Sequence, residues 1–173
     1  WKYGITEYVS PTYYAVNLDG LRWIAARADR AEGRRQAESM LNLLATDIGA
    51  SWWPPAQRVA GAHSRSYDYL HGTGELDKRI ALAGWTNETV RVGVHHADTL
   101  GDDWSLPAAA RQLASRFPRR VRQRWGEGLT QTRSAYLLPD IALSIASAYY
   151  GRQDVPLAVD LPEVEDCGEA VFL

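Results

Sequence analysis

Apolar residues recur at helical spacing through the first third of the chain. Ser10 and Pro11 favour a helix start, because a serine oxygen caps free backbone amides and proline suits the first turn. The pattern predicts one helix running to about Ala28 and a second over about 33–50. The apolar positions are Leu18, Leu21, Ile24 and Ala25 in the first, and Ala37, Met40, Leu41, Leu44 and Ile48 in the second. The short connection between them predicts an antiparallel helical hairpin.

The second helix is followed by Trp52, Trp53, Pro54 and Pro55, and proline ends a helix because it constrains the residue before it as well. A third helix is predicted over about 75–85. Residues 86–106 show no periodicity and predict a long loop, which in a compact domain is typically functional or mobile. A further helix is predicted from Pro107 to about Phe117, resuming to Trp125 after Pro118.

Beyond Gly126 the pattern changes to an alternation of polar and apolar positions. Strands are predicted within 129–138, 142–150 and 156–162, and the final AVFL also has strand character, with no visible partner. The predicted fold is therefore mainly α with a C-terminal β portion. Helical hairpins would occupy 1–126 and antiparallel strands 127–173, the latter as part of a β-sandwich completed elsewhere.

Composition limits the classes of partner. The chain has 173 residues, 46% of them hydrophobic, enough for one core. Its net charge of −2 gives no general attraction to nucleic acid or anionic membrane. No apolar run approaches the ~20 residues of a membrane span. One basic run contains Arg116, Arg119, Arg120, Arg122 and Arg124. Positions 116, 120 and 124 share a helical face, which favours a solvated face over an anion site.

Cys167 is the single cysteine, so the chain has no internal disulfide and no cysteine-rich metal site, while its redox compartment stays open. The sequence begins at Trp1 without a methionine or a signal peptide. This start is compatible with a processed chain, extracellular ones included, with a subunit cut from a precursor, or with a partial sequence. We expect the chain to belong to something larger, and a second chain is one candidate to complete its fold.

Two segments, 5–21 and 58–74, are rich in aromatic and titratable side chains. Such side chains suit the wall of a site for a polar ligand, whereas the plain alternative is half-buried tyrosines beside solvated charges. The candidate catalytic residues are Tyr13, Asn17, His63, Arg65 and Tyr67. The candidate substrate-binding residues are Glu7, Tyr14, Trp52, Trp53, Asp68, Tyr69 and His71.

Each of these residue types suits a particular step of catalysis. Histidine is readily poised as a base near neutral pH, arginine clamps a carboxylate, and tyrosine delivers a proton. Asn17 lies on one helical face with Tyr13, either as part of a ligand-facing stripe or bonded to a neighbouring backbone group. His63, Arg65 and Tyr67 fit a catalytic loop, with a well-satisfied surface loop as the alternative.

Metal and cofactor chemistry find little support in the sequence. His95 and His96 are adjacent and have no further histidine or cysteine at a ligand spacing, so no metal is expected. The nucleophile elbow, phosphate-loop and dinucleotide glycine patterns are absent, and no cofactor is expected. Glu7 with Asp68, or Glu75 with Asp77, resembles a glycosidase carboxylate pair only if the distance between them fits.

The segments EYVSPTYYAVNLDGL and AGAHSRSYDY, joined by a helical hairpin, resemble parts of α/α-toroid (six-hairpin) carbohydrate-active enzymes. Helical hairpins followed by strands around AYYGRQDVPLAVDLP also resemble the toroid-plus-β-sandwich polysaccharide lyases. The likeness covers about two thirds of the chain and extends to no single family. A complete toroid has about twelve helices of roughly 10–14 residues, more than the pattern predicts here.

The resemblance implies β-elimination on a polysaccharide or oligosaccharide, otherwise glycoside hydrolysis. It implies Asn17 or Arg65 as neutraliser of the substrate carboxylate, His63 as base, and Tyr13, Tyr14 or Tyr67 as acid. Two alternatives stay open. One is a small-molecule cyclase, dehydratase or isomerase in a helical cavity, and the other is a non-catalytic sugar-binding or assembly subunit.

Overall fold

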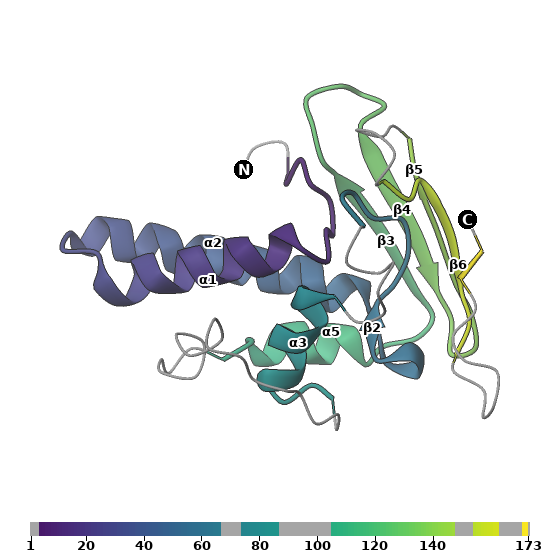
Figure 1. Ribbon diagram of the computed structural model, residues 1–173, viewed down its shortest axis with the longest axis horizontal. Helices are drawn as coiled ribbons and strands as arrows, with labels where there is room; N and C mark the ends of the chain where they lie inside the picture. The colour runs from purple at the N-terminus through teal and green to yellow at the C-terminus, as the bar shows by residue number, and fades with distance from the viewer. Residues whose placement is uncertain (1–3, 67–73, 87–104, 148–153, 163–170, 173) are drawn as a thin grey trace.

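A helical part and an antiparallel sheet form two sides of the molecule. The computed structural model describes residues 4–66, 74–86, 105–147, 154–162 and 171–172. Figure 1 shows the helices on one side of the five-stranded sheet, with the first two projecting away from it. None of the helices in these ranges combines the length and apolar character that crossing a membrane requires.

The predicted helical hairpin is present. Helix α1 (Tyr13–Arg27) and helix α2 (Ala31–Ser51) pack along each other, and Leu18, Leu41 and Leu44 are buried between them. Two shorter helices lie in the part of the chain that the structure describes, α3 (Glu75–Leu82) and α5 (Ala108–Ala114). Burying one apolar face of each helix against its neighbours is the main stabilisation that such helices have.

The chain after α2 turns back on itself before it reaches the second sequence segment. Strand β1 (Trp52–Trp53), the short helix η1 (Pro54–Ala56) and strand β2 (Arg58–Val59) form a small hairpin, in which Trp52 pairs with Val59. This hairpin leads residues 60–66 back along the start of the chain.

The main sheet is an antiparallel meander of sequential strands. Its order is β3 (Arg119–Arg124), β4 (Thr132–Leu137), β5 (Ala142–Ala146), β6 (Leu157–Asp160) and β7 (Val171–Phe172). The strands predicted within 129–138, 142–150 and 156–162 are therefore confirmed. The AVFL segment has a partner after all, since β7 pairs with β6.

Two parts of the predicted fold class are wrong. The described residues form a helical hairpin, two shorter helices and antiparallel sheets, and an α-helical toroid is not shown. The helix predicted to resume to Trp125 is strand β3, so the sheet begins at Arg119 rather than after Gly126. A spacing of four residues separates Arg116, Arg120 and Arg124. It fits one face of a helix, but it also fits one face of a strand, because four is a multiple of the two-residue repeat of a strand.

The inner face of the sheet, toward the helices, carries unusually polar side chains. Arg119 and Gln123 on β3, Arg133 on β4, Ser144 on β5 and Asp160 on β6 are all buried. Such groups are tolerated inside a protein only when hydrogen bonds compensate their desolvation. They therefore mark the layer where the sheet, the helices and the two aromatic-rich segments meet.

Candidate functional site

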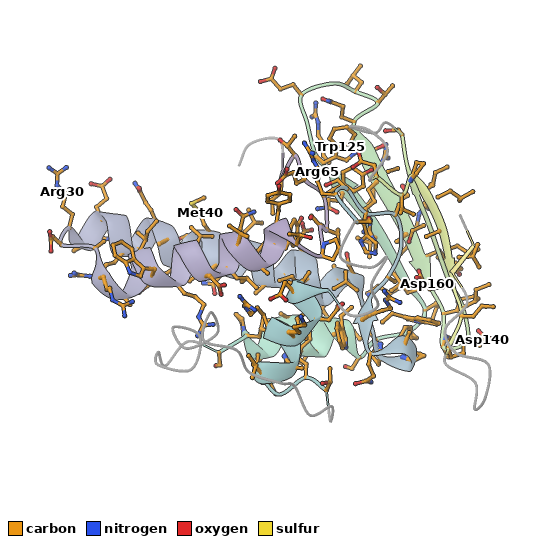
Figure 2. All side chains as sticks on the ribbon, in the orientation of Figure 1. Arg30, Met40, Arg65, Trp125, Asp140 and Asp160 are labelled. Carbon is orange, nitrogen blue, oxygen red and sulfur yellow. The ribbon has the colours of Figure 1, made fainter. Side chains whose placement is uncertain are left out.

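The two segments singled out in the sequence lie against each other. The amide of Ser64 donates to the carbonyl of Tyr8 at 3.1 Å, and the Nδ1 atom of His63 lies 2.9 Å from the carbonyl oxygen of Val9. Figure 2 shows Arg65 between the start of the chain and the sheet. We call residues 7–13 and 63–66 together the double turn.

Both halves of the double turn contain a strained backbone. Val9 has φ 48° and Arg65 has φ 51°, the left-handed region that side chains other than glycine rarely adopt, β-branched ones least of all. Such conformations cost about 1–3 kcal/mol each, persist only where the surroundings hold them, and concentrate at binding and catalytic sites.

Side chains from several elements hold Val9 and Arg65 in these left-handed conformations. The Tyr14 hydroxyl and the His63 ring both hydrogen-bond the backbone of Val9. The amide of Arg65 donates to Oδ1 of Asp154 at 2.8 Å. Ser10 Oγ accepts the amide of Tyr13 at 3.0 Å, but the regular helix begins only at Tyr13, with Thr12 rather than Ser10 at its N-cap position.

The outer side of the double turn presents polar groups to solvent. Arg65 and Glu7 form an ion pair, Nε to Oε1 at 3.6 Å, with side chains 39% and 31% exposed. Tyr13 and Asn17 are half-buried at the start of α1. A guanidinium and a carboxylate are therefore paired on the outer side of the double turn, and Tyr13, whose amide bonds Ser10 Oγ, adds a partly exposed phenol at the end of its first segment. We call Glu7, Tyr13 and Arg65 the rim.

Beneath the double turn lies a buried polar network from three elements. The Tyr14 hydroxyl on α1 donates to Oδ2 of Asp47 on α2 at 2.7 Å, and Nε2 of Gln123 on β3 donates to the Tyr14 hydroxyl at 3.0 Å. Gln123 also donates to Oδ2 of Asp47. Burial, followed by the Asp47 charge, raises the pKa of Tyr14 well above its usual value. Burial likewise raises the pKa of Asp47.

Arg133 on β4 completes this network. Its guanidinium is fully buried and donates to the carbonyls of Ala62 at 2.8 Å and Ala60 at 2.6 Å, and to Ser51 Oγ at 3.1 Å. Burial lowers the pKa of Arg133, and the nearby Asp47 carboxylate opposes that effect. Through these bonds the sheet fixes the segment that carries His63 and Arg65.

His63 is part of the support and does not lie on the surface. Its side chain is buried, and burial, followed by the positive charges of Arg133 and Arg58, lowers its pKa well below the usual value. The ring is therefore neutral at pH 7 and oriented by the Val9 carbonyl. In this position it shapes the turn, and its access to a substrate is blocked by the surrounding protein.

Other candidates from the sequence have a structural place. Tyr14 is buried in the network, and Trp52 and Trp53 are core residues, with Nε1 of Trp53 donating to the carbonyl of Leu138 at 2.7 Å. Neither indole is available for stacking on a sugar, so we assign both to the core. Tyr67, Asp68, Tyr69 and His71 lie outside the described residues.

Of the two carboxylate pairs considered in the sequence, Glu75 and Asp77 are engaged in structural contacts, whereas Asp68 of the other pair lies outside the described residues. Asp77 caps α3, since its Oδ2 accepts the amide of Gly74 at 3.0 Å, and Glu75 pairs with Lys78 and Arg79. Within the described ranges, no group of three or more His, Cys, Asp or Glu side chains could hold a metal ion.

Sequence reasoning missed Asp47, Gln123 and Arg133. Asp47 lies in helix α2, two residues after the apolar pair Leu44 and Ala45. It was missed because only the apolar residues of this helix were considered. A weak signal existed for the other two, because each occupies a core-facing position in an alternating strand. A polar residue at such a position needs a buried partner.

Comparison of the chain with protein-family models, with curated protein sequences and with solved structures gave no match. The resemblance to carbohydrate-active enzymes is therefore neither supported nor contradicted by a relative.

Proposed function

We propose that the double turn is the catalytic surface of a polysaccharide lyase-type enzyme acting on a uronate-containing chain. The observation that carries the proposal is the pair of left-handed residues, Val9 and Arg65, in two touching turns that bring Arg65 and Glu7 together. Strain of this kind, held by a buried network beneath, is typical of pre-organised sites.

The rim supplies the three groups that β-elimination needs. Arg65 is half-exposed and can bind a uronate carboxylate through paired hydrogen bonds, which neutralises the charge that develops on proton removal. Glu7, which now pairs with Arg65, is released when the substrate carboxylate takes its place. It then accepts the proton α to that carboxylate.

The remaining steps follow from this exchange. As the proton moves to Glu7, its electron pair forms the carbon–carbon double bond and the bond to the neighbouring glycosidic oxygen breaks. The Tyr13 hydroxyl donates a proton to that leaving oxygen. The base in this proposal is thus Glu7 instead of His63, because His63 is buried and held by the Val9 carbonyl.

The proposal is tested by incubating the purified chain with polygalacturonate, alginate and a glycosaminoglycan, and measuring the ultraviolet absorbance of unsaturated product. We expect activity on at least one uronate polymer. Arg65→Ala should remove about 3 kcal/mol of transition-state stabilisation, which lowers kcat about a hundredfold. Glu7→Gln and Tyr13→Phe should each lower kcat with a smaller change in KM.

Arg30→Ala is the matched control, because Arg30 is an exposed arginine in the connection between α1 and α2. It should leave kcat unchanged, and circular dichroism should show an intact fold in all variants. Release of reducing sugar without ultraviolet absorbance would replace elimination by hydrolysis. Binding without turnover, unaffected by Glu7→Gln, would favour the non-catalytic sugar-binding alternative.

A further inference from the structure

The outward side of helix α1 is apolar and exposed. Val16, Trp23 and Ile24 have 58%, 55% and 40% of their surface exposed. At 3.6 residues per turn they lie on one side of the helix together with Gly20 and Arg27, opposite its buried side. We call these five residues the α1 face. Single exposed apolar residues are ordinary, but large ones gathered on one side of a helix typically mark an interaction surface.

Gly20 lies at the middle of the α1 face and has open space in front of it. A Cβ atom added there would meet nothing within 4 Å, so no contact among the described residues requires a glycine. Glycine inside a helix costs about 0.5–1 kcal/mol relative to alanine. The side chains at a contact set how closely two helices pack. A surface glycine therefore fits a place where a second helix crosses α1 closely.

The apolar residues of the α1 face are placed symmetrically about Gly20. Val16 lies four residues before it and Ile24 four residues after it, about 6 Å along the helix axis in each direction. When two copies of α1 cross antiparallel at Gly20, Val16 of each copy lies level with Ile24 of the other. The face is therefore complementary to itself.

The charge on the α1 face also favours an antiparallel pair. Arg27 is the one charged residue of the five, and its Cζ atom lies 6.0 Å from the centroid of the Trp23 ring in its own chain. In an antiparallel pair the two Arg27 residues lie at opposite ends of the contact, about 21 Å apart along the axis. A parallel pair would place them side by side. The antiparallel arrangement also sets the positive end of each helix dipole beside the negative end of the other.

We propose that this chain forms a symmetric dimer through the α1 face, with the two copies of α1 antiparallel and Gly20 at the crossing. The hairpin of α1 and α2 projects away from the main sheet, which leaves α1 accessible to a second copy (Figure 1). Both copies use the same residues, as two-fold dimers do. One helix from each copy makes a contact at the small end of specific interfaces, so the dimer should dissociate on dilution.

Two other occupants fit less well. A helix that lies on an anionic membrane carries several cations beside its apolar residues, whereas the α1 face has Arg27 alone. A helix of a different protein would need its own bulky residues at matching distances from a small one. The α1 helix of a second copy already has them, in Val16 and Ile24 on either side of Gly20.

Sedimentation equilibrium of the full chain over a range of concentrations tests the proposal. We expect a reversible equilibrium of monomer and dimer that added salt changes little, because the contact is apolar. Gly20→Ala should raise the dissociation constant about tenfold, since a methyl group at the crossing pushes the two helices apart. In samples diluted until they are monomeric, the same substitution should not destabilise the fold.

A pair of charged variants tests the antiparallel register. V16E/I24E should raise the dissociation constant at least about tenfold, because like charges then meet at the contact. V16K/I24E should associate about tenfold more tightly than V16E/I24E, because each new lysine lies level with a new glutamate of the other copy, and salt should weaken this dimer. The matched control is Leu43→Glu, at a 47% exposed position of α2, which should dimerise as the unmodified chain does.

Circular dichroism should show the same helix content in all these variants. A chain that stays monomeric at about 1 mM would overturn the proposal. So would equal association of V16E/I24E and V16K/I24E, because the antiparallel register predicts a difference between them. A dimer that Leu43→Glu weakens as strongly as V16E/I24E does would place the contact on another surface.

Discussion

At the scale of single residues, the candidate site depends on a few polar side chains that are inside the protein rather than on its surface. Tyr14 and His63 hold Val9 in its left-handed conformation, and Asp154 holds the amide of Arg65. A buried polar side chain with good hydrogen bonds rigidifies its surroundings, because leaving any bond unmade is costly. The exposed rim is therefore positioned by other side chains, of which Tyr14 and His63 are themselves buried beneath it.

The buried imidazole makes stability depend on pH. The pKa of His63 is lower in the folded chain than its ordinary value of about 6.5 in the unfolded chain. Below about pH 6.5 the unfolded chain therefore binds a proton that the folded chain does not, and stability falls as the pH decreases. We expect a loss of about 1 kcal/mol of unfolding free energy per pH unit from this group between pH 6.5 and 5.5.

His63→Asn should reduce that slope, measured by urea unfolding at pH 7.5, 6.5 and 5.5. The raised pKa of Asp47 acts with the opposite sign, since it makes the folded chain the better proton binder. Asp47 and the remaining histidines are common to both proteins, so the difference in slope isolates His63. Identical slopes would show that His63 is not the titrating group.

Polar residues of 5–21 and 58–74 could be expected to meet, because aromatic and titratable groups are unusually dense in both segments. It could not show which of them would be buried. Tyr13 and Tyr14 are neighbours with the same chemistry, yet Tyr13 is half-exposed on the rim and Tyr14 is fully buried. The partners that decide this, Asp47 and Gln123, are distant in sequence, and only the fold brings them near.

At the scale of elements, close packing of α2 against α5 depends on a residue without a side chain. A Cβ atom added to Gly49 would lie 2.5 Å from the carbonyl oxygen of Ala110, whereas one added to Gly20 on α1 would meet nothing within 4 Å. Glycine is otherwise unfavourable inside a helix by about 0.5–1 kcal/mol relative to alanine. Gly49 is thus explained by packing, and Gly20 is not.

The two glycines predict opposite responses to the same substitution. Gly49→Ala should destabilise the chain by about 1–3 kcal/mol, because α5 must move away from α2. Gly20→Ala should stabilise it by about 0.5–1 kcal/mol through helix propensity. Urea unfolding of both variants checks the pair, and destabilisation of equal size at the two positions would contradict the packing argument.

The elements whose apolar residues follow a single period were predictable from the sequence. Strand β3 was not, because the spacing of its arginines fits both a helix and a strand. The helices α1 and α2 and the strands β4 to β6 follow their apolar patterns. In β3, arginines at 120, 122 and 124 fit a strand face, but those at 116, 120 and 124 also fit a helix. In the strand, the buried Arg119 guanidinium donates to the carbonyls of Ala50 and Leu113. Burial lowers the pKa of Arg119 to about 10.

At the scale of the whole molecule, the helices and the sheet are joined through polar contacts as well as apolar ones. Gln123 on β3 bonds Tyr14 of α1 and Asp47 of α2, and Arg133 on β4 bonds Ser51 at the end of α2. The predicted division into a helical region and a strand-rich region therefore separates parts that share one buried network. Parts that share such a network are expected to unfold together.

Replacing Arg133 tests whether the helices and the sheet unfold together. Arg133→Met keeps most of the side-chain volume but removes every donor to Ala60, Ala62 and Ser51, and it leaves the Asp47 carboxyl without its nearby positive charge. Breaking a buried charged contact in this way costs about 3–5 kcal/mol. The unfolding midpoints measured by helical circular dichroism and by tryptophan fluorescence should shift to lower urea by the same amount, since the helices and the sheet lose a common support.

The control is Arg35→Met, at an exposed position of α2, which should change the unfolding free energy by less than about 0.5 kcal/mol. If the helical signal kept its midpoint in Arg133→Met while the fluorescence signal moved, the hairpin would fold independently of the sheet. The double turn would then be an interface between two separable units.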